Sequence, residues 1–206
     1  MRHDDIGRLF AYWNGLRGGR AAPERREIAP AALGARLPYT FILQTSGSGE
    51  PRFRLAGTRI CSIHGRELST LPFTSIWQPK DRNSILRLVK NCMTSKKAVQ
   101  LDCEGRSARN RKTLFKFVLL PLASEANERH LMGMMTVVGR PFWLESDAIV
   151  ENQIQTVSII DPHHSRHEAD LALSAPANAA PHSASRTLVS RRVAHLRVIE
   201  GGRIKN

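Results

Sequence analysis

The chain has 206 residues, of which 41% are hydrophobic and 24% charged, and its formal net charge is +13. This length suffices for one domain of ordinary size with a tail, or for two very small domains. No stretch approaches the roughly 20 apolar residues of a membrane-spanning helix, and the first residues lead into no apolar segment typical of a secretory signal. We therefore expect a cytoplasmic protein, and not a membrane-spanning protein, a secreted mini-protein or a wholly disordered chain.

The cysteines and the basic residues narrow the class further. Cys61, Cys92 and Cys103 form no CxxC pair and are odd in number, which predicts reduced thiols. The positive charge lies mainly in residues 1–150, which is compatible with a nucleic-acid partner, an anionic membrane or a solvated surface. One basic cluster consists of Arg106, Arg109, Arg111 and Lys112. Gly, Ser and Asn residues interrupt it, which predicts an exposed loop between two β-strands. It lacks the aromatic side chains that would stack on the bases of a single-stranded nucleic acid.

Residues 1–37 are predicted to form an N-terminal helical cap. Asp4 or Asp5 can begin a helix that Gly18-Gly19 ends, and Pro30 opens a second, short helix. The first helix carries an apolar stripe that is too hydrophobic to face water. We expect it to cover the protein's own sheet or to pair with a second subunit, and we interpret it as an interface and signalling element: Ile6, Leu9, Phe10, Trp13 and Leu16.

Alternating strands and two helices follow. Residues 39–44 and 52–55 alternate as strands around the loop 46–50, and a short helix is expected from Thr58 to Gly65. A longer helix with Asp81 as its cap carries the stripe Ile85, Leu88, Val89, Cys92 and Met93.

Three further strands are expected at 99–104, 113–122 and 131–139. The last two are apolar at both parities, so both faces of the sheet need a cover. We assign five side chains to the outer face: Leu114, Val118, Leu131, Met135 and Val137.

Beyond residue 145 the pattern weakens. Residues 146–161 are interpreted as a C-terminal helix and residues 162–185, rich in Pro, Ala, Ser and His, as a disordered linker. Residues 186–206 form a basic and apolar terminal segment, for which docking and fraying both stay open.

This order of elements is that of a PAS domain, and short segments carry the same resemblance. The segments FRLAGTRIC (53–61) and HGREL (64–68), then Phe73, Trp77 and Asp81-Arg82, resemble a bacterial family of small single-PAS-domain proteins, as do residues 16–23 and 195–202. The resemblance implies an α+β fold over residues 38–145: a five-stranded antiparallel sheet with helices on one face, preceded by the amphipathic helix. It also implies sensing of small molecules, redox state or light, or dimerisation.

The resemblance places a ligand between the inner sheet face and the long helix. An apolar or aromatic ligand, or a filled core without one, fits the expected lining: Phe41, Phe53, Leu55, Trp77, Ile85, Val89, Leu101, Cys103, Phe115, Phe117, Met132 and Met134.

The cofactor is unknown, and the sequence argues against haem and flavin. Residues 81–97 hold no axial histidine, and His64 on the earlier helix is interpreted as a structural, hydrogen-bonded residue. Cys61 does not lie in the motif of photoactive flavin domains. His163, His164 and His167 lie in the expected linker without a second ligand cluster, so no metal site is predicted.

No P-loop, nucleophile elbow or HExxH motif is present, so we predict no catalytic residues and no enzyme activity. We expect a non-catalytic cytoplasmic sensory or adaptor module that acts through protein–protein interaction, as a homodimer with a signalling partner. Two alternatives stay open. One is a nucleic-acid-associated basic regulator, and the other is a small α+β cavity enzyme, which would need paired Asp or His residues in its cavity.

Overall fold

The computed structural model describes residues 5–46, 49–123, 128–160 and 196–198. The helices and short 3-10 turns are α1 (Asp5–Arg17), η1 (Arg25–Glu27), α2 (Pro30–Leu33), η2 (Gly34–Tyr39), α3 (Thr58–His64), η3 (Phe73–Ile76) and α4 (Pro79–Ser95). The strands are β1 (Thr40–Ser46), β2 (Arg52–Ala56), β3 (Ala98–Ser107), β4 (Lys112–Pro121), β5 (Glu128–Val138), β6 (Ile149–Ile160) and β7 (Leu196–Val198).

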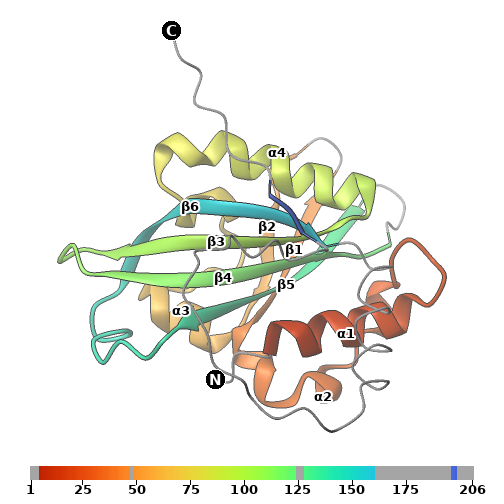
Figure 1. Cartoon of the computed structure of the whole chain (residues 1–206), viewed down its shortest axis with the longest axis horizontal. Coiled ribbons are helices and arrows are strands. Elements are labelled where there is room, and N and C mark those ends of the chain that lie inside the picture. Colours follow the sequence, from red (N-terminus) through yellow and green to blue (C-terminus); the bar gives the residue numbers. More distant parts are fainter. Residues whose placement is uncertain (1–4, 47–48, 124–127, 161–195, 199–206) are drawn as a thin grey trace, which may run out of the picture.

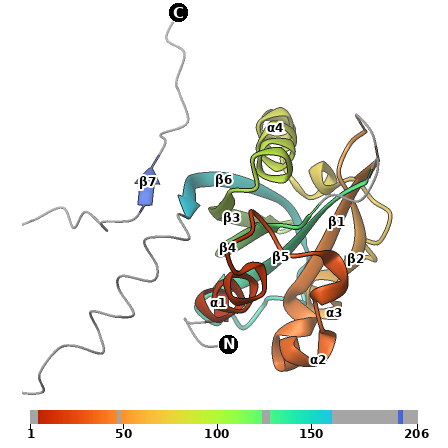
Figure 2. The ribbon, with the colours of Figure 1, turned by 90° about the vertical axis from the view of Figure 1, so that its right-hand side faces the viewer.

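The strands form one antiparallel sheet in the order β2-β1-β5-β4-β3-β6-β7. Helices α3 and α4 lie on one face of the sheet and α1 on the other (Figures 1 and 2). The α+β class, the N-terminal helix and the first five strands of this sheet are therefore confirmed. We call the α4 side the inner face and the α1 side the outer face.

The prediction of a C-terminal helix at 146–161 is wrong, because this segment forms strand β6. It pairs with β3 from Ala98 to Ser107, so the sheet extends beyond the five expected strands. Its isoleucines, valines and threonine favour an extended backbone. β3 would otherwise end the sheet with a long row of unpaired backbone groups, and β6 satisfies them.

Each face of the sheet has its own apolar core. On the inner face, Phe41, Phe117 and Leu119 pack with Ile85 and Val89 of α4. On the outer face, α1 buries three residues of its stripe against β4 and β5: Leu9, Phe10 and Trp13. The indole nitrogen of Trp13 donates to the carbonyl oxygen of Pro121 at 2.8 Å. The expectation that both faces need a cover, with α1 supplying one, is confirmed.

The face assignment on β5 was wrong by one residue. Phe117 pairs with Met135 and Val118 with Met134, so Met135 belongs to the inner core and Met134 to the outer one. When the residues at both odd and even positions of a strand are apolar, their alternation does not show which set faces which side of the sheet. The register with the neighbouring strand does show it. Of the five residues assigned to the outer face, only Val118 is buried there. Leu114 lies on the outer face but is half exposed. The other three belong to the inner core or pack against it: Leu131, Met135 and Val137.

A bulge moves Leu55 out of the core. Leu43 pairs with Phe53 and Ile42 with Leu55, so Arg54 is an extra residue on β2. The bulge changes the side-chain alternation, so Phe53 is buried while Leu55 is 46% exposed. The prediction that both residues face the same way is therefore wrong.

Residues 70–81 form what we call the edge-to-edge segment. At one end, Phe53 on β2 accepts from the backbone of Thr70 at 2.7 Å and donates to that of Leu71 at 2.9 Å. At the other end, the backbone nitrogen of Gln78 donates to the oxygen of Asn152 on β6 at 3.0 Å. The segment thus contacts both β2 and β6, and supplies partners for otherwise open edges.

Helix α4 begins at Pro79, with Gln78 as its N-cap, so the prediction of Asp81 as the cap is wrong. Proline suits the first helical position because its missing N–H has no helical partner there. The Asp81 carboxylate lies in the first turn instead. It accepts from the side-chain nitrogen of Gln78 at 2.7 Å and from the backbone nitrogen of Ile154 at 2.9 Å, which fastens α4 to β6.

The expected linker at 162–185, with His163, His164 and His167, lies outside the described residues. Of the terminal segment 186–206, only β7 is described, and it pairs with Ser158–Ile160 of β6. Among the described helices, none has the length and apolar character needed to span a membrane.

Candidate ligand-binding site

The region between α4 and the inner sheet face brings together nine of the twelve predicted pocket residues. They are buried in one apolar cluster: Phe41, Phe53, Trp77, Ile85, Val89, Leu101, Cys103, Phe115 and Phe117. The other three are elsewhere. Leu55 is exposed, and Met132 and Met134 are buried on the outer face with α1.

Aromatic rings fill the centre of this region. Phe41, Phe53, Phe73, Trp77 and Phe117 contact one another with ring centroids 5.4 to 6.5 Å apart, mostly edge to face. These are favourable distances for aromatic pairs. The described side chains therefore pack as a core, and a ligand here would have to displace some of them.

A polar network that the sequence analysis did not find borders this aromatic core. Asn152 on β6 is fully buried, and its side-chain nitrogen donates to the oxygen of Ile76 at 2.8 Å. The same nitrogen lies 3.2 Å from Nε2 of His64, whose Nδ1 lies 2.9 Å from the oxygen of Ile60. Because a carbonyl oxygen only accepts, the proton belongs on Nδ1, and Nε2 accepts from Asn152. The sequence predicts a helix over residues 146–161, so it does not indicate that Asn152 contacts His64.

Two polar atoms at this site make no hydrogen bond within the described part of the chain. They are the indole nitrogen of Trp77, a donor, and the side-chain oxygen of Asn152, an acceptor. Both side chains are at least 99% buried. Because most buried polar atoms in proteins are paired, one free donor and one free acceptor beside the same core are the groups that a bound molecule would satisfy.

The titratable groups here are held in their neutral forms. Burial lowers the pKa of His64 from 6.5 to about 4, so the imidazole is neutral at physiological pH. Both of its ring nitrogens make hydrogen bonds, as the interpretation of His64 as a structural residue expects. Burial also raises the pKa of the Cys92 thiol to about 12, and it raises the pKa of the Cys103 thiol as well. The half-buried Cys61 has its pKa raised as well, again mainly by burial.

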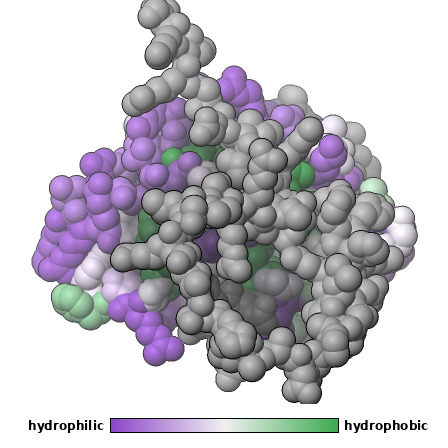
Figure 3. All heavy atoms as spheres, in the orientation of Figure 1, coloured by the Kyte–Doolittle hydropathy of each residue, from purple (hydrophilic) through white to green (hydrophobic). Residues whose placement is uncertain are grey.

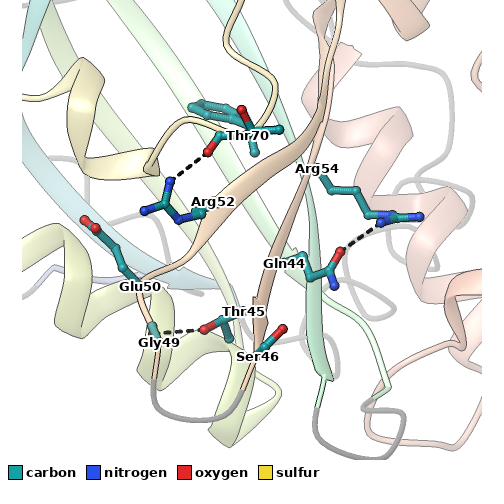
Figure 4. Close-up of a pocket in the computed structure, with 9 residues that line it drawn as sticks. Gln44, Thr45, Ser46, Gly49, Glu50, Arg52, Arg54 and Thr70 are labelled. Carbon is teal, nitrogen blue, oxygen red and sulfur yellow. Dashed lines mark hydrogen bonds between the residues drawn. The ribbon is translucent and has the colours of Figure 1, made fainter.

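A surface hollow of about 580 Å³ lies elsewhere, at the β1–β2 turn (Figure 4). Arg52 donates to the oxygen of Thr70 at 2.9 Å, and Arg54 donates to the side-chain oxygen of Gln44 at 3.1 Å. Seven of the nine lining residues are polar or charged, and one of the nine, Phe53, belongs to the predicted pocket. The lining consists of Gln44, Thr45, Ser46, Gly49, Glu50, Arg52, Phe53, Arg54 and Thr70. The hollow lies at the surface beside the β1–β2 turn and not between α4 and the inner sheet face, where the sequence analysis places the ligand.

The predicted basic loop is a strand pair joined by a turn. Arg106 on β3 faces Lys112 on β4, so these two do not belong to the loop. Three of the four cations pair with acidic side chains: Lys112 with Glu104 at 2.9 Å, Arg111 with Asp147 at 3.7 Å, and Arg106 with Glu151. The cluster is exposed as expected, except for the half-buried Arg111.

The residues predicted as an interface mostly face the protein's own sheet. Leu9, Phe10 and Trp13 are buried, and Ile6 and Leu16 are half-buried. While α1 stays docked, the protein's own sheet covers the centre of this stripe.

A family model described as a PAS domain matches residues 1–136. The chain belongs to the PAS domain family. One similar solved structure is the PAS-B domain of Drosophila melanogaster Cycle, in a tryptophan-to-alanine variant with bound glycerol. Its TM-score is 0.37 and its sequence identity 16%, and the match covers 48% of this chain and 99% of that one. A variant of RsLOV is similar at a TM-score of 0.40 and 11% identity, covering 70% of this chain and 74% of that one. No curated protein matches.

Proposed function

We propose that this PAS domain protein is a non-catalytic sensory or adaptor module of the cytoplasm that signals through protein–protein interaction as a homodimer. PAS domains are typically sensory or signalling modules. The sequence contains none of the catalytic motifs sought. The observation that carries the sensory part is the unpaired donor and acceptor on Trp77 and Asn152 inside the core.

The input in this proposal is a small apolar or aromatic molecule with one hydrogen-bond acceptor and one donor. Its body would pack among the rings of Phe73 and Phe117, and its polar groups would meet the Trp77 indole nitrogen and the Asn152 oxygen. Pairing those two atoms supplies orientation and specificity, while apolar burial supplies most of the affinity. Entry of such a molecule requires repacking of the inner core, which links binding to a change of conformation.

Native mass spectrometry of the full chain, purified from its own host, tests both parts together. We expect twice the mass of the chain plus one small ligand per subunit. Asn152→Ala and Trp77→Phe should lose the ligand mass and retain the subunit count. Gln153→Ala, at the neighbouring and only half-buried position on β6, is the matched control and should keep both.

Two results would contradict the proposal. A wild-type chain that carries no added mass has a filled core, and Trp77 and Asn152 are then only structural. Retention of the chain on DNA in a salt-dependent manner, with no protein partner, would favour the nucleic-acid-associated regulator instead.

A further inference from the structure

One end of the molecule carries a protruding feature that the sensory proposal does not use. It consists of the β3–β4 turn and the loop between β5 and β6, residues 107–112 and 139–147, which we call the basic tip. Figure 1 shows both loops at the left-hand end, away from α1 and from the chain's β1–β2 hairpin. In the same orientation the surface of this end is mostly hydrophilic, with one small hydrophobic patch (Figure 3).

The backbone of the β5–β6 loop keeps the Phe142 side chain exposed to solvent. Its side chain is 94% exposed, whereas that of the next residue, Trp143, is 9% exposed. A turn hydrogen bond of 3.1 Å joins Leu144 to Pro141, and the backbone nitrogen of Asp147 donates to the oxygen of Trp143 at 3.0 Å. With Trp143 anchored and the turn closed, Phe142 cannot fold back onto the core. The Phe142 ring is therefore an exposed apolar group at the end of this loop.

The two loops are joined into one rigid unit. Ser107 donates through its hydroxyl to the Asp147 carboxylate at 2.8 Å. The Arg111 guanidinium lies 3.7 Å from that carboxylate and 6.0 Å from the centre of the Trp143 ring. Phe142 and the basic turn therefore face their surroundings from the same end with fixed relative positions.

The tip carries an excess of positive charge. In and beside the tip, four cations pair with four acidic side chains: Arg59 with Glu145, Arg106 with Glu151, Arg111 with Asp147 and Lys112 with Glu104. Arg109 and Arg140 are exposed, and neither forms an ion pair with any residue that the structure describes.

We propose that the basic tip docks on the surface of an anionic lipid bilayer. Phe142 enters the boundary between headgroups and acyl chains, and Arg109 and Arg140 contact the lipid phosphates. An aromatic side chain beside uncompensated cations matches this boundary, where apolar insertion and charge attraction act together. A convex tip with a single exposed aromatic ring suits a flat surface. A nucleic-acid strand would need a groove with successive stacking platforms.

Co-sedimentation of the full chain with vesicles tests the proposal. We expect binding to phosphatidylcholine vesicles that contain phosphatidylserine, and little binding to phosphatidylcholine alone. Phe142→Ala should weaken binding about tenfold. Arg109→Glu and Arg140→Glu should each weaken it at least about fivefold, and added salt should reduce it. Leu55→Ala and Arg87→Glu change an exposed leucine and an exposed arginine outside the tip, so both should bind as the wild type does.

A second readout follows the inserted side chain directly. In Phe142→Trp, the fluorescence difference from the parent chain should shift to shorter wavelength with the anionic vesicles only. Equal binding to neutral vesicles, wild-type binding by the three tip variants, or binding to duplex DNA in place of vesicles would each overturn the proposal. None of these measurements depends on the ligand of the inner core, so the sensory proposal stands or fails separately.

Discussion

Nε2 of His64 lies 3.2 Å from the side-chain nitrogen of Asn152, although 88 positions of the chain separate the two residues. Asn152 also donates to Ile76, so one side chain joins α3, η3 and strand β6 inside the core. The network requires a neutral imidazole, because a protonated Nε2 would present a donor to another donor.

His64 therefore makes stability depend on pH. In the unfolded chain the imidazole titrates near pH 6.5, and in the folded protein its pKa is about 4. Between these values only the unfolded state binds the proton, so the free energy of unfolding falls as the pH falls through this window, by about 3 kcal/mol in all. Urea denaturation at pH 7 and pH 5 should show about 2 kcal/mol of this fall, and His64→Gln should lessen it. An unchanged pH dependence in His64→Gln would show that other groups cause the fall.

Trp13 should act mainly through stability. It is fully buried against the outer face and donates to Pro121, so we expect Trp13→Ala to lower the free energy of unfolding by about 3–5 kcal/mol. Leu16→Ala, half-buried on the same helix, should cost clearly less. Denaturant titration measures both. If Trp13→Ala left stability intact and changed only the subunit count in sedimentation, α1 would be an interface between subunits after all.

Gly133 on β5 leaves room for the ring of Phe41. A Cβ at this position would lie 2.2 Å from that ring, so Gly133→Ala should destabilise the fold by about 1–3 kcal/mol through overpacking. Gly15 in α1 has open space around it, and Gly15→Ala should stabilise by about 0.5–1 kcal/mol because alanine favours the helix. Thermal unfolding should move in opposite directions for the two variants. A shift of the same sign would contradict the packing described here.

The four cations around the β3–β4 turn should differ in importance. Arg109→Ala should change stability by no more than about 0.5 kcal/mol, as expected at an exposed site. Arg111→Ala should cost about 1–2 kcal/mol, because it leaves the buried Asp147 carboxylate with one partner fewer and removes the contact with Trp143. Solvent screens part of this pair, which keeps the figure small. Equal effects in chemical denaturation would show that the Arg111 contacts contribute nothing.

The thiols should react in a set order. Cys61 is half-buried, whereas Cys92 and Cys103 are buried and have their pKa values raised the most. Since the thiolate is the reactive form, an aromatic disulfide reagent at neutral pH should label Cys61 first in the folded chain and all three thiols after denaturation. Mass spectrometry of the labelled chain identifies the order. Early labelling of Cys103 would mean that the inner core opens readily.

The elements with a single strong period were predictable from the sequence. α1, α3, α4 and the strands up to β5 were expected close to where they lie, because caps, breakers and one-sided apolar patterns determine such elements locally. Strand β6 was missed because its residues alternate poorly, and because its stability comes from the open edge of β3, which lies more than forty residues earlier in the chain.

The candidate site was predictable in its apolar part and not in its polar part. Phe117 and Val89 follow from strand and helix periods, whereas Met134 required the β4–β5 register and Leu55 required the bulge at Arg54. The pairing of His64 with Asn152 depends on the tertiary path of β6. The exposure of Phe142 could not be predicted either, since the sequence of a loop does not show which of its aromatic residues is buried.

The edge-to-edge segment has a consequence for the shape of the sheet. From Phe53 to Asn152 the path across the sheet covers at least five strand spacings, about 24 Å. Between Leu71 and Gln78 the segment connects the same two strands, β2 and β6, and four of its residues form the compact turn η3. At about 2 Å per residue in η3 and about 3.4 Å elsewhere, the chain from Leu71 to Gln78 reaches about 18 Å, and the hydrogen-bonded steps to Phe53 and to Asn152 add about 5 Å each, which gives about 28 Å. This reach exceeds the path across the sheet by only about 4 Å, so the segment has little slack. Because it connects β2 to β6 on the inner side of the sheet, it limits how far these two strands can move apart.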